Sequence, residues 1–271
     1  MKKNKKSVIK GFFVFMFLIS IFAIWDNGQK ILQVGSQRTN EDTFFGEIKE
    51  YSSGNASLNR GSIKEVEINW QVGGIEIREY DGEEIKFKES ADNDINNENQ
   101  MKYLAKNGKL ILRYNGKMEE EYINKIQKKN LVLMIPKKDS LRIREIKINA
   151  VSSNIDIATD NIQKLKIDSN DGEMNICGSY KDLEIEGISG NISMELMTCP
   201  KKIKSKTVTG DITLEIPENK GFSVEHDMIN GNFECDFELT SKNNYAIYKK
   251  PKSVFELMTA SGSVDIEKAN G

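Results

Sequence analysis

The sequence predicts an all-β chain in which a β-solenoid repeat domain follows one N-terminal transmembrane helix. Three observations carry this prediction. One short phrase recurs from Ile146 to Ile266, each copy closes on a glycine bend, and an uncharged apolar run lies near the N-terminus. Apolar and polar residues alternate within each copy, which is typical of a strand with one buried face.

Each copy reads apolar-x-apolar, a polar bend, Gly, and then apolar-x-apolar again. In one copy, Leu165–Ile167 precedes Gly172 and Met174–Ile176 follows it, and Val66–Ile77 is an early copy of the same phrase. Glycine supplies the backbone angles that such a bend requires. The predicted repeat-turn glycines are Gly73, Gly172, Gly190, Gly210, Gly231 and Gly262.

The spacing of the copies indicates how they associate. Glycines at 172, 190, 210 and 231 give steps of 18, 20 and 21 residues, whereas the step from 231 to 262 is 31 and leaves room for an insertion around Leu239–Ser253. A single copy buries too little apolar surface to fold alone, so the copies must stack. Two arrangements fit: a parallel solenoid with one copy per rung, or antiparallel hairpins closed by each glycine dipeptide. The equal step favours the solenoid, with consecutive copies side by side.

The N-terminal segment predicts a membrane anchor. Residues 1–10 form a basic head, and residues 11–25 carry no charge. Fifteen helical residues span about 22 Å, which is short for a hydrocarbon core of about 30 Å. Lys10 can reach the headgroups on one side, and Trp25 suits the opposite interface.

A cleavable signal peptide is the alternative for this segment. It needs a small-x-small cleavage site, and Ile21-Phe22-Ala23 is a poor one. We therefore expect an uncleaved signal anchor. The basic head then places the chain beyond residue 26 outside the cytoplasm, so the predicted location is the cell membrane, with a single span and an extracytoplasmic C-terminal domain.

The remaining chain divides into a polar stalk over 26–62 and the repeat domain over 63–271. Within the repeat domain we expect a strand at Glu84–Lys88, a hairpin around Asn107-Gly108, and a continuous apolar strand at Leu131–Pro136 buried on both faces.

The charge and the cysteine content reduce the number of function classes that the sequence supports. Lys plus Arg total 39 and Asp plus Glu total 41, a net charge of −2, so no nucleic-acid partner is predicted. The odd set of Cys177, Cys199 and Cys235 contains no C-x-x-C pair and predicts neither a disulfide framework nor a metal site. The polar loop Asp92–Glu98 lacks the spacing of a calcium loop.

No motif predicts catalysis or a cofactor. His226 is the sole histidine, and there is no nucleophile elbow, H-E-x-x-H or phosphate-binding loop. A pair of catalytic carboxylates, as in glycosidases, is still an alternative. The acidic candidates, however, recur at equivalent repeat positions, as expected of a solvent-exposed face of the solenoid. Those candidates are Asp168, Asp171, Glu173, Asp211 and Glu215.

The repeats resemble the bacterial putative adhesin family, a domain of unknown function with β-strand repeats. The resemblance rests on Leu131–Pro136, Leu141–Ile148 and the recurring [Ser/Thr/Asp/Asn]-Gly-x-[Ile/Val/Met]-x-[Ile/Leu/Met], and it covers Val66 to Ile266. It implies a Gram-positive-type surface location, since some members are encoded near cell-envelope-stress systems, and it brings no catalytic residue. The chain departs from the pattern at Ser153-Asn154, which lacks the glycine, and in the insertion before residue 255.

These observations predict a membrane-anchored, outward-facing, non-enzymatic scaffold. Its partners would be the membrane and a wall polymer, another envelope protein or a host surface. Two other classes stay open. One is a sensory or regulatory partner in an envelope-stress system. The other is a carbohydrate-active β-helix enzyme, which requires acidic side chains of adjacent rungs clustered with exposed aromatics in one groove.

Overall fold

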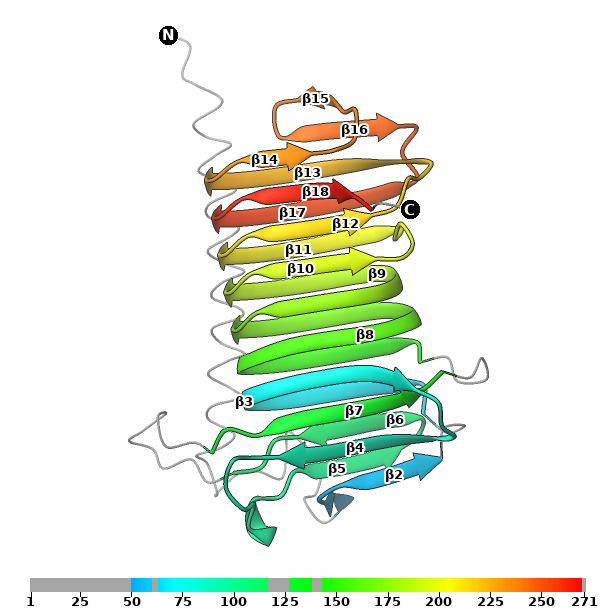
Figure 1. The fold of residues 1–271 in the computed structure, drawn as a ribbon, viewed down its shortest axis with the longest axis vertical. Helices are drawn as coiled ribbons and strands as arrows, with labels where there is room; N and C mark the ends of the chain where they lie inside the picture. The colour runs from blue at the N-terminus through cyan, green and yellow to red at the C-terminus, as the bar shows by residue number, and fades with distance from the viewer. Residues whose placement is uncertain (1–49, 60–62, 117–126, 138–142, 270–271) are drawn as a thin grey trace.

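The computed structural model describes residues 50–59, 63–116, 127–137 and 143–269 (Figure 1). These residues are nearly all in strands, as the alternating pattern predicts, and one short 3₁₀ helix, η3 (Asn97–Asn99), interrupts them. The strands are β1 (Ser52–Ser53), β2 (Ala56–Asn59), β3 (Glu65–Tyr80), β4 (Glu84–Ser90), β5 (Lys102–Lys106), β6 (Lys109–Arg113), β7 (Asn130–Pro136), β8 (Glu145–Asp171), β9 (Met174–Ser189), β10 (Ile192–Leu196), β11 (Lys202–Thr209), β12 (Ile212–Ile216), β13 (Gly221–Asn230), β14 (Phe233–Cys235), β15 (Thr240–Lys242), β16 (Tyr245–Lys249), β17 (Ser253–Ser261) and β18 (Val264–Lys268).

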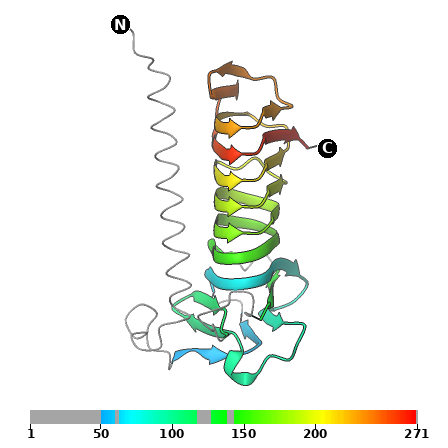
Figure 2. The same ribbon diagram turned by 90° about the vertical axis from the view of Figure 1, so that its left-hand side faces the viewer.

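The recurring phrase forms a coil of parallel strands, a β-solenoid. Each copy is one rung with two arms: the first arm precedes the glycine corner and the second follows it. Successive rungs pair in parallel and in register, so Ile157 lies beside Ile176, which lies beside Met194. From the base upward the rungs are 65–80, 145–158, 164–178, 182–196, 202–216, 253–268 and 221–235. Figure 2 shows the narrow stack rising above a wider base.

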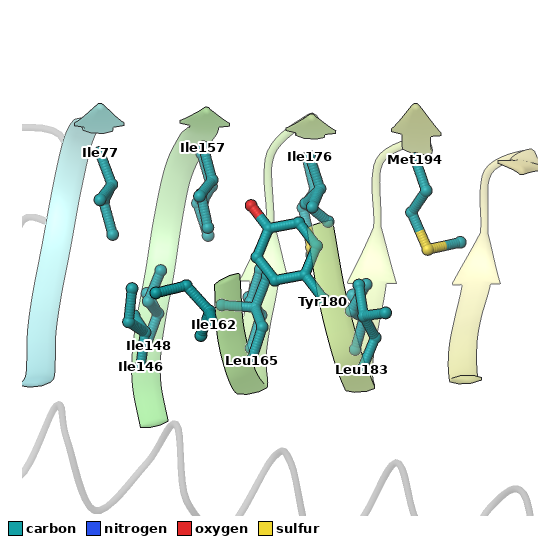
Figure 3. Packing of buried hydrophobic residues seen from close by; sticks show 14 of the residues in the cluster. Ile77, Ile146, Ile148, Ile157, Ile162, Leu165, Ile176, Tyr180, Leu183 and Met194 are labelled. Carbon is teal, nitrogen blue, oxygen red and sulfur yellow. The ribbon is translucent and has the colours of Figure 1, made fainter. Parts of the chain in front are cut away.

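Apolar side chains of neighbouring rungs stack inside the coil. Figure 3 shows Ile77, Ile157, Ile176 and Met194 in one row along the interior, and each is at most 2% exposed. A buried aliphatic side chain stabilises the fold by about 2 kcal/mol. Because every rung contributes several such residues to one column, the rungs stabilise one another.

The order of the last two rungs differs from the order of the sequence. We expected consecutive copies side by side, which is correct for residues 145–216. The final copy, β17 and β18, instead lies between the rung of β11 and β12 and the rung of β13 and β14 (Figure 1). The cause is the insertion before residue 253, which folds into the hairpin β15–β16. This hairpin pairs β16 with β13 on one edge, leaving the other edge of β13 to receive β17.

The corner glycines stack closely on the rung below. Gly172, Gly190 and Gly210 have φ between +118° and +138°. A Cβ on Gly190 would lie 2.2 Å from the carbonyl oxygen of Gly172, and one on Gly210 would lie 2.2 Å from that of Gly190. Ser153 replaces glycine in its rung and has no positive φ, so a side chain is tolerated there.

Further strands close the base of the coil. The first rung, β3, pairs in parallel with β6 and β7 on its lower side, and β5, β4, β2 and β1 continue the sheet outward in antiparallel pairs. The predicted hairpin is present, with Asn107 (φ 53°) and Gly108 (φ 80°) in its turn.

Two predictions about the base are wrong. The polar stalk expected over 26–62 does not include residues 52–59, because β1 and β2 are part of the base sheet, where main-chain pairing orders a polar sequence. The strand Leu131–Pro136 is not buried on both faces: Leu131 and Leu133 are fully buried, but Val132 and Met134 are partly exposed, because β7 covers the end of the coil with one face.

The predicted basic head (1–10) and transmembrane segment (11–25) lie outside the described residues. Within the ranges that the structure describes, there is no helix of sufficient length and apolarity to cross a membrane.

A buried ion pair holds the base together. The side chain of Lys129 is 0% exposed and that of Glu89 is 3% exposed. The Lys129 ammonium donates to Glu89 Oε2 and to the carbonyl oxygens of Asn99 and Asn115, each at 2.7 Å, and lies 4.4 Å from the centre of the Tyr114 ring. Burial lowers the pKa of Lys129, and the bond to Glu89 opposes that shift.

We expect Gly210→Ala to destabilise the coil by about 2–3 kcal/mol, because alanine is strained at φ +138° and its Cβ would collide with the Gly190 carbonyl. Gly187→Ala is the matched control. Its Cβ would meet only the side-chain ends of Met174 at 3.3 Å and Thr207 at 3.5 Å. Urea unfolding of the full chain, followed by circular dichroism, measures both, and equal losses would contradict the close approach at the corner.

We expect Lys129→Met to cost about 3–5 kcal/mol, because it leaves the Glu89 carboxylate buried without a cation. Lys106→Met is the control: its partner Glu50 lies 2.8 Å away in a pair whose side chains are about half exposed, so the loss should be about 1 kcal/mol or less. The same unfolding measurement applies. A loss at Lys129 no larger than that at Lys106 would show that the buried pair does not hold the base.

Candidate binding surface

The solenoid presents two outward surfaces, one formed by the first arms of the rungs and the other by the second arms. Since side chains alternate along each strand, every second residue of an arm points outward. Since the rungs are in register, outward residues of neighbouring rungs form columns along the coil. Consecutive residues in a column are about 4.8 Å apart. The chemistry of each surface therefore depends on which residues recur at these positions.

On the first-arm surface, opposite charges of neighbouring rungs pair. Lys166 Nζ lies 3.2 Å from Glu184 Oε1, and Lys206 Nζ lies 2.5 Å from Glu256 Oε1. Lys204 forms a further ion pair with Glu186. These pairs compensate one another's charge, so this surface has no strong preference for a charged partner.

On the second-arm surface, carboxylates stack over carboxylates. Glu195, Glu215 and Glu267 follow one another in a single column, and Glu234 lies over Asp265 in the next. None of them forms an ion pair with any described residue. Asp211, at the start of the second arm that contains Glu215, is close enough to raise the pKa of Asp265. We call the group Glu195, Asp211, Glu215, Glu234, Asp265 and Glu267 the acidic face.

The electrostatic effect is concentrated at Asp265. Burial raises the pKa of its carboxyl group, and the negative charges of Glu234, Asp211 and Glu267 raise it further. Like charges on neighbouring strands destabilise a sheet. The acidic face therefore costs stability that a cation could recover.

The corner of each rung adds polar main-chain support. Asn191 Oδ1 accepts a hydrogen bond from the backbone N–H of Asp211 at 2.9 Å, and Asp211 Oδ1 accepts one from Ser263 N–H at 2.7 Å. Asn191 and Asp211, the residues after Gly190 and Gly210, thus each anchor the rung above. This ladder fixes the spacing of the carboxylates beside it.

Comparison with known proteins identifies the repeat region. Residues 139–267 match the family model described as Toastrack DUF4097.

This part of the chain is similar to the Toastrack family, and we refer to residues 139–267 as the Toastrack domain.

The rung 65–80 lies outside the matched residues but pairs with the first rung of the Toastrack domain along its whole length, from Glu65 to Arg78. Sheet pairing therefore extends the stack beyond the matched residues.

Solved structures give further likenesses. One is a putative cell adhesion protein from Clostridium sporogenes ATCC 15579, with 17% identity and a TM-score of 0.45, over 81% of this chain and 100% of that one. A putative adhesin from Bacteroides fragilis NCTC 9343 has 13% identity and a TM-score of 0.40, over 80% and 97%. A putative lipid binding protein from Parabacteroides distasonis ATCC 8503 has 12% identity and a TM-score of 0.30, over 82% and 98%. No curated protein matches the chain.

The five carboxylates considered from the sequence are distributed around the Toastrack domain. Asp168 lies on the first-arm surface, where burial raises its pKa although Lys166 is 3.7 Å away. Asp171 and Glu173 flank a corner glycine, and Asp211 and Glu215 belong to the acidic face. They do not converge, and no outward residue of the second arms between residues 154 and 267 is aromatic. A carbohydrate-cleaving groove is therefore not assembled from them.

His226 lies in β13 at the upper end of the Toastrack domain. Its ring stacks on Phe233 with centroids 3.8 Å apart and an angle of 6° between the planes. Burial lowers the pKa of the imidazole, and Asp227 opposes the shift. The ring contributes to the packing at the end of the coil.

The three cysteines are free and partly buried. Burial raises the pKa of Cys177, Cys199 and Cys235, so each thiol is protonated at neutral pH. The loop 92–98 contributes to a pocket of about 260 Å³ at the base, beside Glu89. Among the described residues, no three His, Cys, Asp or Glu side chains are placed to hold a metal ion.

Sequence reasoning missed the acidic face, although a signal for it was present. Glu195, Glu215 and Glu267 each stand five residues after a corner glycine, and none has a lysine at the same position of a neighbouring rung. Comparing outward positions column by column would have found them. The buried Lys129–Glu89 pair had no such signal, because the two residues are 40 positions apart.

We expect Asp265→Asn to stabilise the protein at pH 7. The folded chain holds a proton on Asp265 more tightly than the unfolded chain does. Stability from this residue is therefore lost as the pH rises through the folded-state pKa. The gain should vanish below the ordinary Asp pKa of about 3.9, where the wild-type carboxyl is also neutral.

Asp182→Asn is the matched control, because Asp182 lies between Lys164 and Lys202 in register on the first-arm surface. It should give no gain at pH 7. Urea unfolding at pH 7 and pH 3 measures both variants. A gain from Asp265→Asn that is independent of pH, or that Asp182→Asn shares, would rule out carboxylate repulsion as its cause.

Proposed function

We propose that this chain is a non-enzymatic binding scaffold of the cell envelope, held at the membrane by residues 11–25 and facing outward. Its partner is an extended, positively charged component of the envelope, such as a wall polymer with repeated cationic groups. The observation that carries the proposal is the acidic face: carboxylates repeat along the coil with no cation beside them among the described residues.

The spacing of the acidic face favours an extended partner over a compact one. Carboxylates in one column recur at about 4.8 Å, and the backbone of the rungs fixes their positions. A polymer or extended segment with regularly repeated cations can meet several of them at once. Each pairing at an exposed site contributes little, so binding would depend on many contacts and would weaken with salt.

The distribution of the polar groups favours a binding scaffold over an enzyme. His226 is stacked on an aromatic ring, and the candidate carboxylates lie on different surfaces. The three thiols have raised pKa values. None of these arrangements supplies an activated nucleophile or a matched acid and base.

The N-terminal sequence supports the proposed outward location. Residues 1–10 are basic and residues 11–25 are uncharged, and a basic flank stays on the cytoplasmic side. An envelope partner is therefore consistent with the compartment that the sequence predicts.

The test is retention of the full chain, in detergent micelles, on isolated cell wall and on membrane fractions. The triple variant E195Q/E215Q/E267Q should bind the wall roughly three- to tenfold more weakly, because three exposed pairings are lost. The matched control D92N/D94N/E98Q makes the same charge change at the base, and each triple raises the net charge from −2 to +1. The control should bind like the original protein.

Equal losses in both triple variants would show that only net charge matters, and the proposal would fail. Retention on membranes but not on wall, with both triples unaffected, would instead favour the sensory or regulatory role.

A further inference from the structure

The coil is closed at its base but only half covered at its upper end. β14 pairs with β18 on one edge. The hairpin β15–β16 covers β13 along Gly221–Glu225 and does not pair with β14. The upper edge of β14 (Figure 1) therefore has no strand partner among the described residues.

The backbone at this edge is oriented for a further strand. Asn232 O accepts from Val264 N–H at 2.9 Å, and Asp236 N–H donates to Ile266 O at 3.0 Å. Because hydrogen-bonding groups alternate between the two sides of a strand, the N–H and C=O groups of Phe233 and Cys235 point away from β18. In the described part of the chain, nothing accepts or donates to them.

The side chains at this end are also incompletely covered. Leu257 and Val264, one rung below, are fully buried, whereas His226, Met228 and Phe233 of the last rung remain partly exposed. The neighbouring Ile229 is 61% exposed. An added strand would bury this apolar surface, as each rung does for the one below it.

The negative charge at the edge of β14 favours one kind of residue at the position that an added strand would stack on Glu234. Glu234 is exposed and lies over Asp265, whose carboxyl group already has a raised pKa among its acidic neighbours. A residue stacked on Glu234 therefore enters a negative field. A basic side chain suits that position, and an acidic one is disfavoured.

We propose that β14 receives an extended segment of a partner protein that carries an apolar–basic–apolar triplet. The segment adds the next rung by strand addition, with main-chain bonds to Phe233 and Cys235. Its apolar residues cover those two side chains, and its basic residue pairs with Glu234. At the corner, Asn232 Oδ1 accepts an N–H of the segment, as Asn191 and Asp211 do in the rungs below.

A second copy of this chain fits the edge less well. Pairing two copies about a two-fold axis through β14 places one Glu234 beside the other. Stacking head to tail is blocked as well, because β6 and β7 already occupy the lower edge of the first rung. Charge thus favours a basic partner segment over self-association.

The test is binding of two labelled peptides to the full-length protein, followed by fluorescence anisotropy. The peptides are Thr-Thr-Val-Lys-Val-Thr-Thr and the counterpart with Glu in place of Lys. The original protein should bind the Lys peptide more tightly. Glu234→Lys should reverse this preference, with each affinity changing roughly three- to tenfold.

Two matched comparisons locate the site. Asp92→Lys makes the same charge change in the exposed loop at the base, outside the acidic face, and it should leave the preference for the Lys peptide intact. Cys235→Pro removes an outward N–H from the edge and should abolish binding of both peptides, whereas Cys235→Ala should retain it.

The proposal is overturned if Glu234→Lys keeps the original preference, or if Asp92→Lys alters it equally. It is also overturned if sedimentation shows that the full-length protein self-associates and that Cys235→Pro dissociates it, since the occupant would then be a second copy. Glu234 is exposed, so the charge reversal decides the matter even if the proline variant fails to fold.

Discussion

The close approach of backbone to backbone at the corner is the constraint on which the coil depends. Each corner glycine places its α-carbon against a carbonyl oxygen of the rung below, where a Cβ would lie about 2 Å away. This contact sets the register of both arms. Once the register is fixed, inward residues must stack on inward residues and outward residues on outward ones. The apolar interior and the acidic face are thus two consequences of the same geometry.

The sequence predicts the rungs well because their information is local. The alternation of apolar and polar residues defines the strands, and glycine marks the corners. The all-β architecture and the register within a rung could therefore be predicted from the sequence. The order of the rungs could not. Val224 and Ile203 each lie beside Phe255, and the equivalent residues of any two copies would pair in the same way. The hairpin β15–β16 decides the order, and its antiparallel pairing with β13 is a contact that the repeat pattern does not encode.

The sequence predicts that the solenoid has polar outward surfaces, but it does not predict which of them is acidic. Each rung offers outward polar positions, so a solvated flank was expected. Whether a column is neutral or acidic depends on the residue one rung above, about 20 positions away in sequence. Lys204 has Glu184 and Glu256 as its register neighbours, whereas Glu215 has Glu195 and Glu267. The composition of one strand cannot distinguish these cases, and the net charge of −2 conceals the difference.

The two ends of the coil resolve the same physical problem in opposite ways. A stack of rungs must end somewhere, and its last rung exposes an edge and an apolar interior. At the base, β6 and β7 pair with that edge, and the strands around them enclose the Lys129–Glu89 pair at the cost of burying two charges. At the upper end, the hairpin closes only the half over Phe222, where Phe237 and Tyr248 pack on its ring. Among the residues that the structure describes, the half over Phe233 keeps a free edge beside the carboxylate of Glu234, which has no ion-pair partner there. Since the described chain covers one half with its own hairpin and not the other, the uncovered half is the place where a partner strand gains the most from binding.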